Sequence, residues 1–162
     1  VLVNNAGITR DNLLMRMKDE DWQAILDTNL TSVYRASKAV MRGMMKARKG
    51  RIINIASVIG VTGNAGQSNY AAAKAGVMAL TRCAALEAAE FGIRINAVAP
   101  SIAIHAFLKK SASEELLNEL SAKEAFGRGA EPWEVANVMI FLASDYSSYM
   151  TGEVVSVSSQ HA

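Results

Sequence analysis

The sequence predicts an α/β fold, with an open parallel sheet and helices packed on it. Helical patterns separate four short apolar runs rich in β-branched residues, at residues 1–3, 51–56, 94–99 and 153–157. Each run is close to continuously apolar, which is typical of strands buried on both faces of a parallel sheet. The 162 residues contain no internal repeat or linker, so we expect one domain or part of one.

The connecting segments are predicted to be helical, at residues 19–48, 69–90, 115–121 ("ELLNELS") and 132–144. The first of them begins with three acidic residues, which suit a helix N-terminus, and we expect a break near Asn29. The stretch from Ser111 to Glu114 fits a capping box ahead of the third helix. Pro132 suits the first turn of the fourth helix.

Composition excludes several classes of protein. Hydrophobic residues make up 51% of the chain, and the formal net charge of +2 gives no reason to expect a nucleic-acid partner. The longest uncharged stretch, residues 52–73, is interrupted by Gly, Asn, Ser and Gln, so we expect no membrane span. Cys83 is the only cysteine, which favours a reducing compartment, the cytoplasm, and we expect its thiol to be buried. We predict no metal site.

The stretch "NYAAAK", residues 69–74, places Tyr70 and Lys74 one helical turn apart. Four residues is the spacing that brings two side chains onto one face of a helix. A free tyrosine has a pKa near 10, and an ammonium group on the same face is expected to lower that pKa. A tyrosine tuned in this way can donate a proton to a carbonyl oxygen as a hydride reaches the carbon.

Other polar or small residues follow the predicted strands. Ligands of open α/β sheets bind beyond the carboxyl ends of the strands. The first strand is followed by Asn4-Asn5-Ala6-Gly7, whose glycine allows close approach of a ligand to the backbone. The second ends at Ser57, whose hydroxyl can hold a carbonyl oxygen beside Tyr70. Together these residues predict a site for carbonyl reduction.

These motifs, in this order and spacing, resemble the short-chain dehydrogenase/reductase family, and the first half resembles its bacterial 3-oxoacyl-[acyl-carrier-protein] reductases. The resemblance implies the C-terminal part of a Rossmann-type, doubly wound parallel sheet. It implies that Tyr70 is the acid–base group, that Lys74 binds the nicotinamide ribose, that Ser57 orients the substrate carbonyl and that Asn29 holds a water in a proton relay. The residues implied at the cofactor are Asn5, Ala6, Gly7, Tyr70, Lys74, Pro100 and Ala103.

The implied reaction is the NADPH-dependent reduction of a 3-oxoacyl thioester of acyl carrier protein or CoA, with NADH left open. The alternatives are an oxidoreductase acting on another ketone or secondary alcohol, and an inactive fragment that only oligomerises. The family also implies a homo-oligomer, a tetramer or dimer. A basic stripe on one predicted helix fits a solvated face or attraction for an acidic acyl carrier protein, and it comprises Arg35, Lys38, Arg42 and Lys46.

The sequence departs from the family at its beginning. No glycine-rich, pyrophosphate-binding turn precedes Val1, so we interpret residues 1–162 as a single partial Rossmann domain without the N-terminal cofactor half. The strand at residues 1–3 is then expected to be an unpaired apolar edge. We expect the chain alone to bind cofactor poorly and to be inactive.

Two further departures lie in the second half. Ser101 stands where the family has glycine and His105 stands near a usual threonine, so we expect the loop to run differently. Up to about Gly76 the sequence resembles the fatty-acid enzyme, and from about Thr81 it resembles a more divergent branch. A junction within residues 70–76, arising by recombination or amplification, is one hypothesis for this change.

Overall fold

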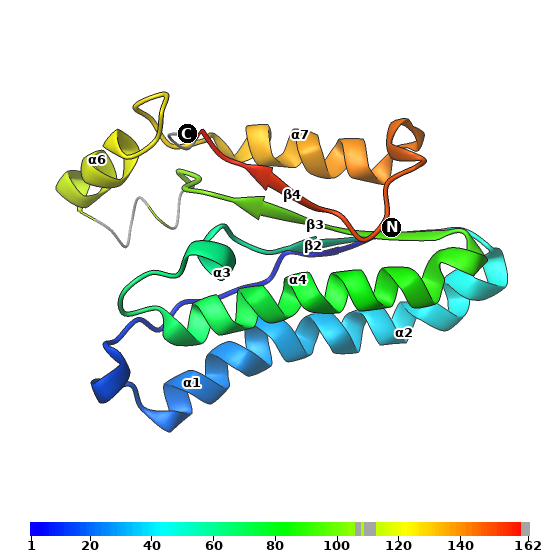
Figure 1. Cartoon of the computed structure of the whole chain (residues 1–162), viewed down its shortest axis with the longest axis horizontal. Helices are drawn as coiled ribbons and strands as arrows, with labels where there is room; N and C mark the ends of the chain where they lie inside the picture. Colours follow the sequence, from blue (N-terminus) through cyan, green and yellow to red (C-terminus); the bar gives the residue numbers. More distant parts are fainter. Residues whose placement is uncertain (106–107, 109–112, 160–162) are drawn as a thin grey trace.

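The computed structural model describes residues 1–105, 108 and 113–159. Four parallel strands form one sheet in the order β1-β2-β3-β4, which confirms the predicted fold class (Figure 1). The strands are β1 (Leu2–Asn4), β2 (Gly50–Ile55), β3 (Ile93–Pro100) and β4 (Val154–Val157). Each end lies within one residue of its predicted position.

The helices are α1 (Asp19–Leu26), α2 (Ser32–Ala47), α3 (Ile59–Thr62), α4 (Ser68–Ala88), α6 (Glu114–Ala122) and α7 (Pro132–Ala143). The break predicted near Asn29 is a π-helical turn, Asp27–Thr31, between α1 and α2. Pro132 is the first residue of α7, as predicted. The predicted cap Ser111 lies outside the described residues, and the N-cap that α6 shows is Ser113, which accepts a hydrogen bond from the Leu116 amide.

The sheet has helices on both faces. Helices α2 and α4 cover one face and α7 covers the other (Figure 1). Neighbouring residues of β2 point to opposite faces, because Ile52 packs in the cluster beneath α2 and α4 and Ile53 packs with Leu142 of α7. Met41, Met44 and Met45 of α2 pack against the cluster that holds Ile52, so their helical spacing reflects core packing. No described helix is long and apolar enough to cross a bilayer.

One side of β1 has no neighbouring strand. Within the described residues the strand pairs with β2 alone, so it is an edge of this sheet, as predicted. Val1 is 76% exposed and Val3 is 41% exposed, which leaves apolar surface in water beside the free backbone edge. An exposed apolar edge of this kind favours association with other strands.

Helix α3 lies against the start of α4 at a glycine, which gives a stability prediction. A Cβ at Gly60 would stand 2.9 Å from the backbone nitrogen of Ala75 and 3.0 Å from the carbonyl carbon of Lys74. Backbone cannot move aside as a flexible side chain can, so Gly60→Ala is expected to lower the free energy of unfolding by about 1–3 kcal/mol. Chemical denaturation measures this change.

Gly43 of α2 is the matched control for Gly60. Among the described residues, nothing lies within 4 Å of a Cβ built there. Gly43→Ala is therefore expected to raise the free energy of unfolding by about 0.5–1 kcal/mol, because alanine favours a helix interior. Stabilisation by both substitutions would contradict the close α3–α4 contact.

Candidate active site

The carboxyl ends of β1, β2 and β3 meet at one edge of the sheet. Side-chain hydrogen bonds between the sheet and its helices fix the end of β1. Asn4 Nδ2 donates to Asn54 Oδ1 at 2.8 Å and to Ser37 Oγ at 3.2 Å. Asn54 Nδ2 in turn donates to Thr81 Oγ1 at 2.9 Å, which links β2 to α4. This network fixes the point from which residues 5–7 leave the sheet.

Asn29 is fully buried in the π-helical turn and holds the loop after β1. Its Oδ1 accepts a hydrogen bond from the Ile8 amide at 2.9 Å, and its Nδ2 donates to the Ile8 carbonyl at 2.8 Å. The side-chain amide is therefore occupied with backbone groups on both sides. Inserted π turns shift the backbone hydrogen-bond register and are frequent at functional sites. The structure thus places Asn29 beside the predicted cofactor loop.

Ser57 lies at the junction of β2 and β3. The amide of the next residue, Val58, donates to the Pro100 carbonyl at 3.1 Å, so the end of β3 holds the serine loop. Ser57 is 7% exposed, and its Oγ accepts a weak hydrogen bond from the Ile59 amide at 3.3 Å. The serine hydroxyl also lies close enough to the Tyr70 phenol to lower its pKa, which brings two predicted catalytic side chains together.

Lys74 lies deep in the same site. Its Nζ lies 5.6 Å from the centroid of the Tyr70 ring and donates to the Ile55 carbonyl at 2.6 Å. The side chain is 4% exposed, and this burial lowers the pKa of Lys74 to about 8. One turn of α4 therefore brings the phenol and the amine together, as the spacing predicts.

The effect on the tyrosine is opposite to the prediction. Burial raises the pKa of Tyr70 above its ordinary value near 10, the hydrogen bond with Ser57 lowers it and the charge of Asp11 raises it. The expected lowering by Lys74 is not what the structure shows, because burial of the phenol is the largest effect on its pKa. Tyr70 therefore holds its proton firmly.

The predicted cofactor residues divide into two groups. Asn5, Ala6 and Gly7 are exposed, and a Cβ at Gly7 would stand 3.5 Å from Asn29 Oδ1 and 3.8 Å from Lys74 Nζ. A side chain at position 7 would fill space directly beside both polar groups. Because glycine has no side chain, the backbone of residue 7 stays open to a ligand there.

The other group lies at the end of β3. Ala103 pairs with Ala130 in a short parallel bridge. Ser101 does not adopt the positive φ that glycine allows, and its amide donates to the Val157 carbonyl at 3.1 Å. The substitution of Ser101 for glycine is thus accommodated by extended pairing with β4.

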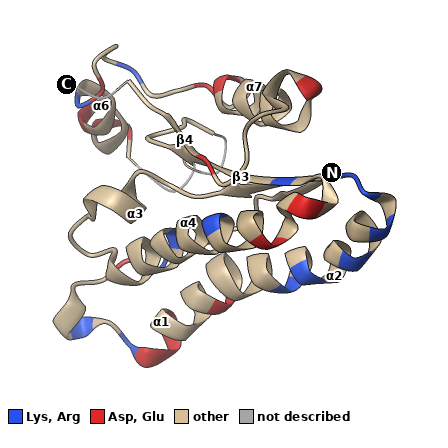
Figure 2. Ribbon diagram, turned by 45° about the vertical axis from the view of Figure 1, so that its right-hand side comes forward, with Lys and Arg blue, Asp and Glu red and all other residues tan. Residues whose placement is uncertain are grey.

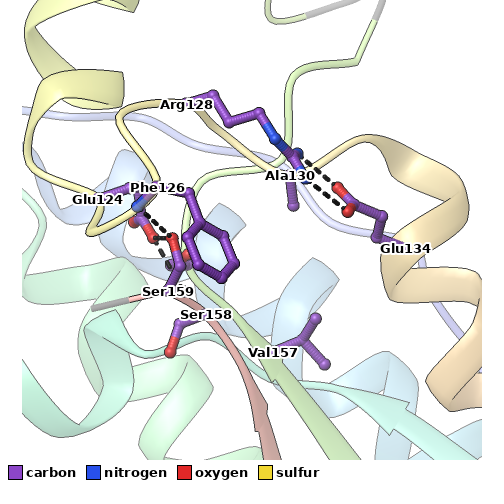
Figure 3. A pocket seen from close by; sticks show the side chains of 9 residues that line it. Glu124, Phe126, Arg128, Ala130, Glu134, Val157, Ser158 and Ser159 are labelled. Carbon is purple, nitrogen blue, oxygen red and sulfur yellow. Dashed lines mark hydrogen bonds and ion pairs between the residues drawn. The ribbon is translucent and has the colours of Figure 1, made fainter. Parts of the chain in front are cut away.

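A cavity of about 130 Å³ lies beyond the ends of β3 and β4 (Figure 3). Ser101 and the apolar side chains of Phe126 and Val157 line it, and the Arg128–Glu134 ion pair closes one side at 2.7 Å. Arg128 lowers the pKa of Glu134 to about 2. The described residues that line the cavity do not include Ser57, Tyr70 or Lys74, so it is separate from their cluster.

Sequence reasoning missed two features. The same spacing of tyrosine and lysine occurs at Tyr34 and Lys38 of α2, where Nζ lies 5.5 Å from the ring centroid and 3.1 Å from the hydroxyl. That pair is exposed and has no strand-end serine beside it in the part of the chain that the structure describes. Asn69, next to Tyr70, was also missed, although the stretch "NYAAAK" contains it.

Comparisons with known proteins agree with this arrangement. The family model described as Enoyl-(Acyl carrier protein) reductase matches residues 1–159. A curated relative from Mycobacterium tuberculosis, (5R,7aS)-5-hydroxy-7a-methyl-1-oxo-2,3,5,6,7,7a-hexahydro-1H-indene-carboxyl-CoA reductase, is 62% identical over 162 residues, 99% of this chain and 62% of its own length. The 3-oxoacyl-[acyl-carrier-protein] reductases of Vibrio cholerae and Escherichia coli are each 54% identical over 157 residues, 97% of this chain and 64% of their own length.

A crystal structure of a short chain dehydrogenase from Mycobacterium smegmatis superposes with a TM-score of 0.83 and 55% sequence identity. The match covers 99% of this chain and 59% of that chain, so this chain spans less than two thirds of each relative named. The relative from M. tuberculosis matches both sides of the predicted junction at residues 70–76, and the junction stays a prediction. The family model matches nearly the whole of this chain, so the chain belongs to the short-chain dehydrogenase/reductase family.

Proposed function

We propose that the protein to which these residues belong reduces the ketone of an acyl thioester with a nicotinamide cofactor. The observation that carries this proposal is the cluster of the half-buried Tyr70 with the buried side chains of Ser57 and Lys74. It joins a protonated phenol, a hydroxyl that can donate a hydrogen bond to the same substrate oxygen, and an amine with a pKa of about 8. Such a set suits proton donation to a carbonyl oxygen at neutral pH.

The chain's own residues divide the work. Ser57 donates to the carbonyl oxygen and orients it toward Tyr70, which delivers the proton as negative charge develops on that oxygen. Because the pKa of Lys74 lies below that of Tyr70, an ammonium at position 74 can return a proton to the phenolate. Asn29 holds the loop after β1 through Ile8 and, in this proposal, takes part in the proton relay.

The open backbone at Gly7 suits the binding of a nicotinamide cofactor. A ligand can approach the backbone of residues 5–7 there, because no side chain stands between Gly7 and Lys74 Nζ. In this proposal Asn5, Ala6, Gly7, Tyr70 and Lys74 would hold the group, and Pro100, which ends β3, and Ala103 would contact it. When bound, the cofactor supplies the hydride that reaches the carbonyl carbon.

Two substrate classes compete within this proposal. The 54% identity to 3-oxoacyl-[acyl-carrier-protein] reductases supports a linear 3-oxoacyl thioester. The 62% identity to the M. tuberculosis reductase, whose name describes a bicyclic CoA thioester, supports a ring ketone carried on CoA. Both share a ketone and a thioester, so the reacting groups and their roles are the same.

The test compares these substrates directly. NADPH or NADH oxidation is measured with 3-oxoacyl-CoA, the same acyl group on acyl carrier protein, and a bicyclic keto-CoA. The enzyme is used as the 162-residue chain and as a hybrid in which the glycine-rich segment of the V. cholerae reductase precedes Val1. We expect turnover by the hybrid with NADPH and little by the chain alone. A soluble, folded hybrid that reduces none of the three substrates would refute the proposal.

The basic stripe on α2 bears on the choice of acyl carrier. Arg35, Lys38, Arg42 and Lys46 are all exposed, and Figure 2 shows the basic residues along this helix. A positive face of this kind speeds encounter with an acidic carrier protein.

Replacing all four residues with glutamine is expected to lower kcat/KM for the carrier-bound substrate about 10-fold at low salt. It should leave the value for the CoA substrate unchanged, which makes CoA the internal control. Equal values for both carriers before and after the change would show that the stripe is only a solvated face.

We also propose that the protein is a homo-oligomer, a dimer or tetramer, assembled through the outer faces of α2 and α4. Exposed apolar side chains on these helices support an interface, with Tyr34 46% exposed and Leu86 83% exposed. Sedimentation of the parent chain beside Leu86→Glu tests this. An unchanged oligomer in the variant would place the interface elsewhere.

A further inference from the structure

Residues 10–12 lie across the start of α4 and bond to it at three points. Asn69 Nδ2 donates to the Arg10 carbonyl at 2.9 Å, and Gln67 Nε2 donates to Asp11 Oδ2 at 2.8 Å. The Asn12 amide donates to the carbonyl of residue 66 at 2.8 Å. We call residues 10–12 the crossing segment. It runs antiparallel to residues 66–69, so each of its residues meets a different part of the entry to α4.

The crossing segment is itself anchored. Arg10 forms an ion pair with Asp21 of α1 at 2.8 Å. Asn12 Nδ2 donates to the Arg16 carbonyl at 3.1 Å, in the short turn that precedes α1. The segment therefore connects α1 with the first residues of α4.

Asn69 is the residue through which this connection reaches Tyr70. It is fully buried, and its Oδ1 accepts a hydrogen bond from the Tyr70 amide at 2.7 Å while its Nδ2 holds the Arg10 carbonyl. The N-cap residue of α4, Gln67, makes no side-chain capping bond. The first amides of a helix have no backbone carbonyl to bond within the helix, so other groups must accept from them. Asn69 supplies one of them, at the residue that bears the phenol.

We propose that Asn69 is a positioning residue for Tyr70, holding the start of α4 against the crossing segment so that the phenol stays in its buried setting beside Ser57. The proposal rests on the proposed function, in which Tyr70 is the proton donor. Asn69 itself touches no reacting atom in this arrangement, because its two polar atoms are bound to backbone groups.

The consequence for Tyr70 follows from the groups around it. Burial and the charge of Asp11 raise the pKa of the phenol, and the hydrogen bond with Ser57 lowers it. Lys74 Nζ, 5.6 Å from the ring centroid, faces the ring from the next turn of α4. If the start of α4 moves away from the crossing segment, the phenol gains water and leaves both Asp11 and Ser57. Loss of the dominant effect, burial, brings the pKa down toward 10.

Asn96 provides a matched control. It is a buried asparagine with the same pattern of bonds, since its Nδ2 donates to the Met150 carbonyl at 2.9 Å and its Oδ1 accepts from the Glu153 amide at 3.0 Å. Those partners lie in the loop before β4. Asn69→Ala and Asn96→Ala should therefore cost similar free energies of unfolding, about 1–3 kcal/mol.

The first readout is the pKa of Tyr70 in the 162-residue chain. It is measured by pH titration, monitored by NMR of ring-labelled tyrosine. The chain has four tyrosines, and Tyr70→Phe identifies the signal. We expect the pKa to fall toward 10 in Asn69→Ala and to stay unchanged in Asn96→Ala. Asn69→Ser keeps a small acceptor near the Tyr70 amide and should give an intermediate pKa. It replaces Asn69→Ala in this measurement if that variant does not fold.

The second readout is kinetic and uses the hybrid chain. Asn69→Ala is expected to lower kcat about 10- to 100-fold with little change in KM, since a small displacement of a catalytic group lowers the rate steeply. An unchanged Tyr70 pKa in Asn69→Ala, or a kcat equal to that of Asn96→Ala, would overturn the positioning role. Failure of the proposed function looks different, because Tyr70→Phe would then retain full activity whatever Asn69 does.

Discussion

Tyr70→Phe is expected to lower kcat for ketone reduction by about 10²- to 10⁴-fold while leaving the fold intact. The substitution removes only the hydroxyl, and the phenylalanine ring keeps the packing of the tyrosine ring beside Lys74. Ser57 then still orients the carbonyl oxygen, but no group delivers the proton as charge develops on that oxygen. The measurement is NADPH oxidation by the hybrid chain with saturating 3-oxoacyl thioester.

Tyr34→Phe is the control for this prediction. Tyr34 has a lysine at the same spacing, Lys38, with a similar distance of 5.5 Å from Nζ to the ring centroid. Its setting differs, because it is 46% exposed on α2. We expect activity within about twofold of the parent for Tyr34→Phe, since removing a surface hydroxyl changes little. Equal losses from the two substitutions would contradict the assignment of Tyr70 as the proton donor.

The order of the two pKa values explains why this site suits reduction. Tyr70 keeps its proton at neutral pH because burial raises its pKa, so the acid form is ready when the carbonyl oxygen gains charge. Lys74, with a pKa of about 8, is mostly charged at pH 7 and is the stronger acid of the two. Proton return from Lys74 to a Tyr70 phenolate is therefore downhill.

Much of the fold could be predicted from local patterns. Continuous apolar runs located all four strands, and Pro132 located the start of α7. Asn29 indicated the break between α1 and α2, although nothing in the sequence distinguished a π turn from a loop. The prediction for Cys83 was wrong, because its side chain is exposed. Helix α4 is alanine-rich on every side, so its composition does not reveal which face is buried.

For the candidate site, the grouping of Ser57, Tyr70 and Lys74 was predictable from the sequence, but the electrostatics of the group were not. Spacing placed Tyr70 and Lys74 on one face, and the strand-end rule placed Ser57 beside them. The direction of the Tyr70 pKa shift depends on burial and on Asp11, 59 residues away in sequence. These effects arise only when distant segments pack together.

Arg94 is expected to have the largest effect on stability among the described side chains that we consider. Its guanidinium is buried, with 8% of the residue exposed, and donates to the carbonyls of Ser144 and Ser147 at 2.7 and 2.5 Å. Ser144 ends α7, whose last carbonyls have no partners within the helix. Arg94→Met is expected to lower the free energy of unfolding by about 3–5 kcal/mol, because it removes charge-assisted hydrogen bonds to two carbonyls from a buried site.

The comparison with Arg128 separates buried bonding from charge alone. Arg128 makes two short bonds to Glu134 at 2.7 and 2.8 Å, yet its side chain is 52% exposed. Water can replace the partner there, so Arg128→Met should cost far less stability than Arg94→Met. Arg94 joins the start of β3 to the end of α7 and to the loop before β4. Its loss should therefore release amide hydrogens of both α7 and β4 to exchange while those of α2 stay protected. Equal small losses of stability from the two substitutions would show that α7 is held by its apolar face alone.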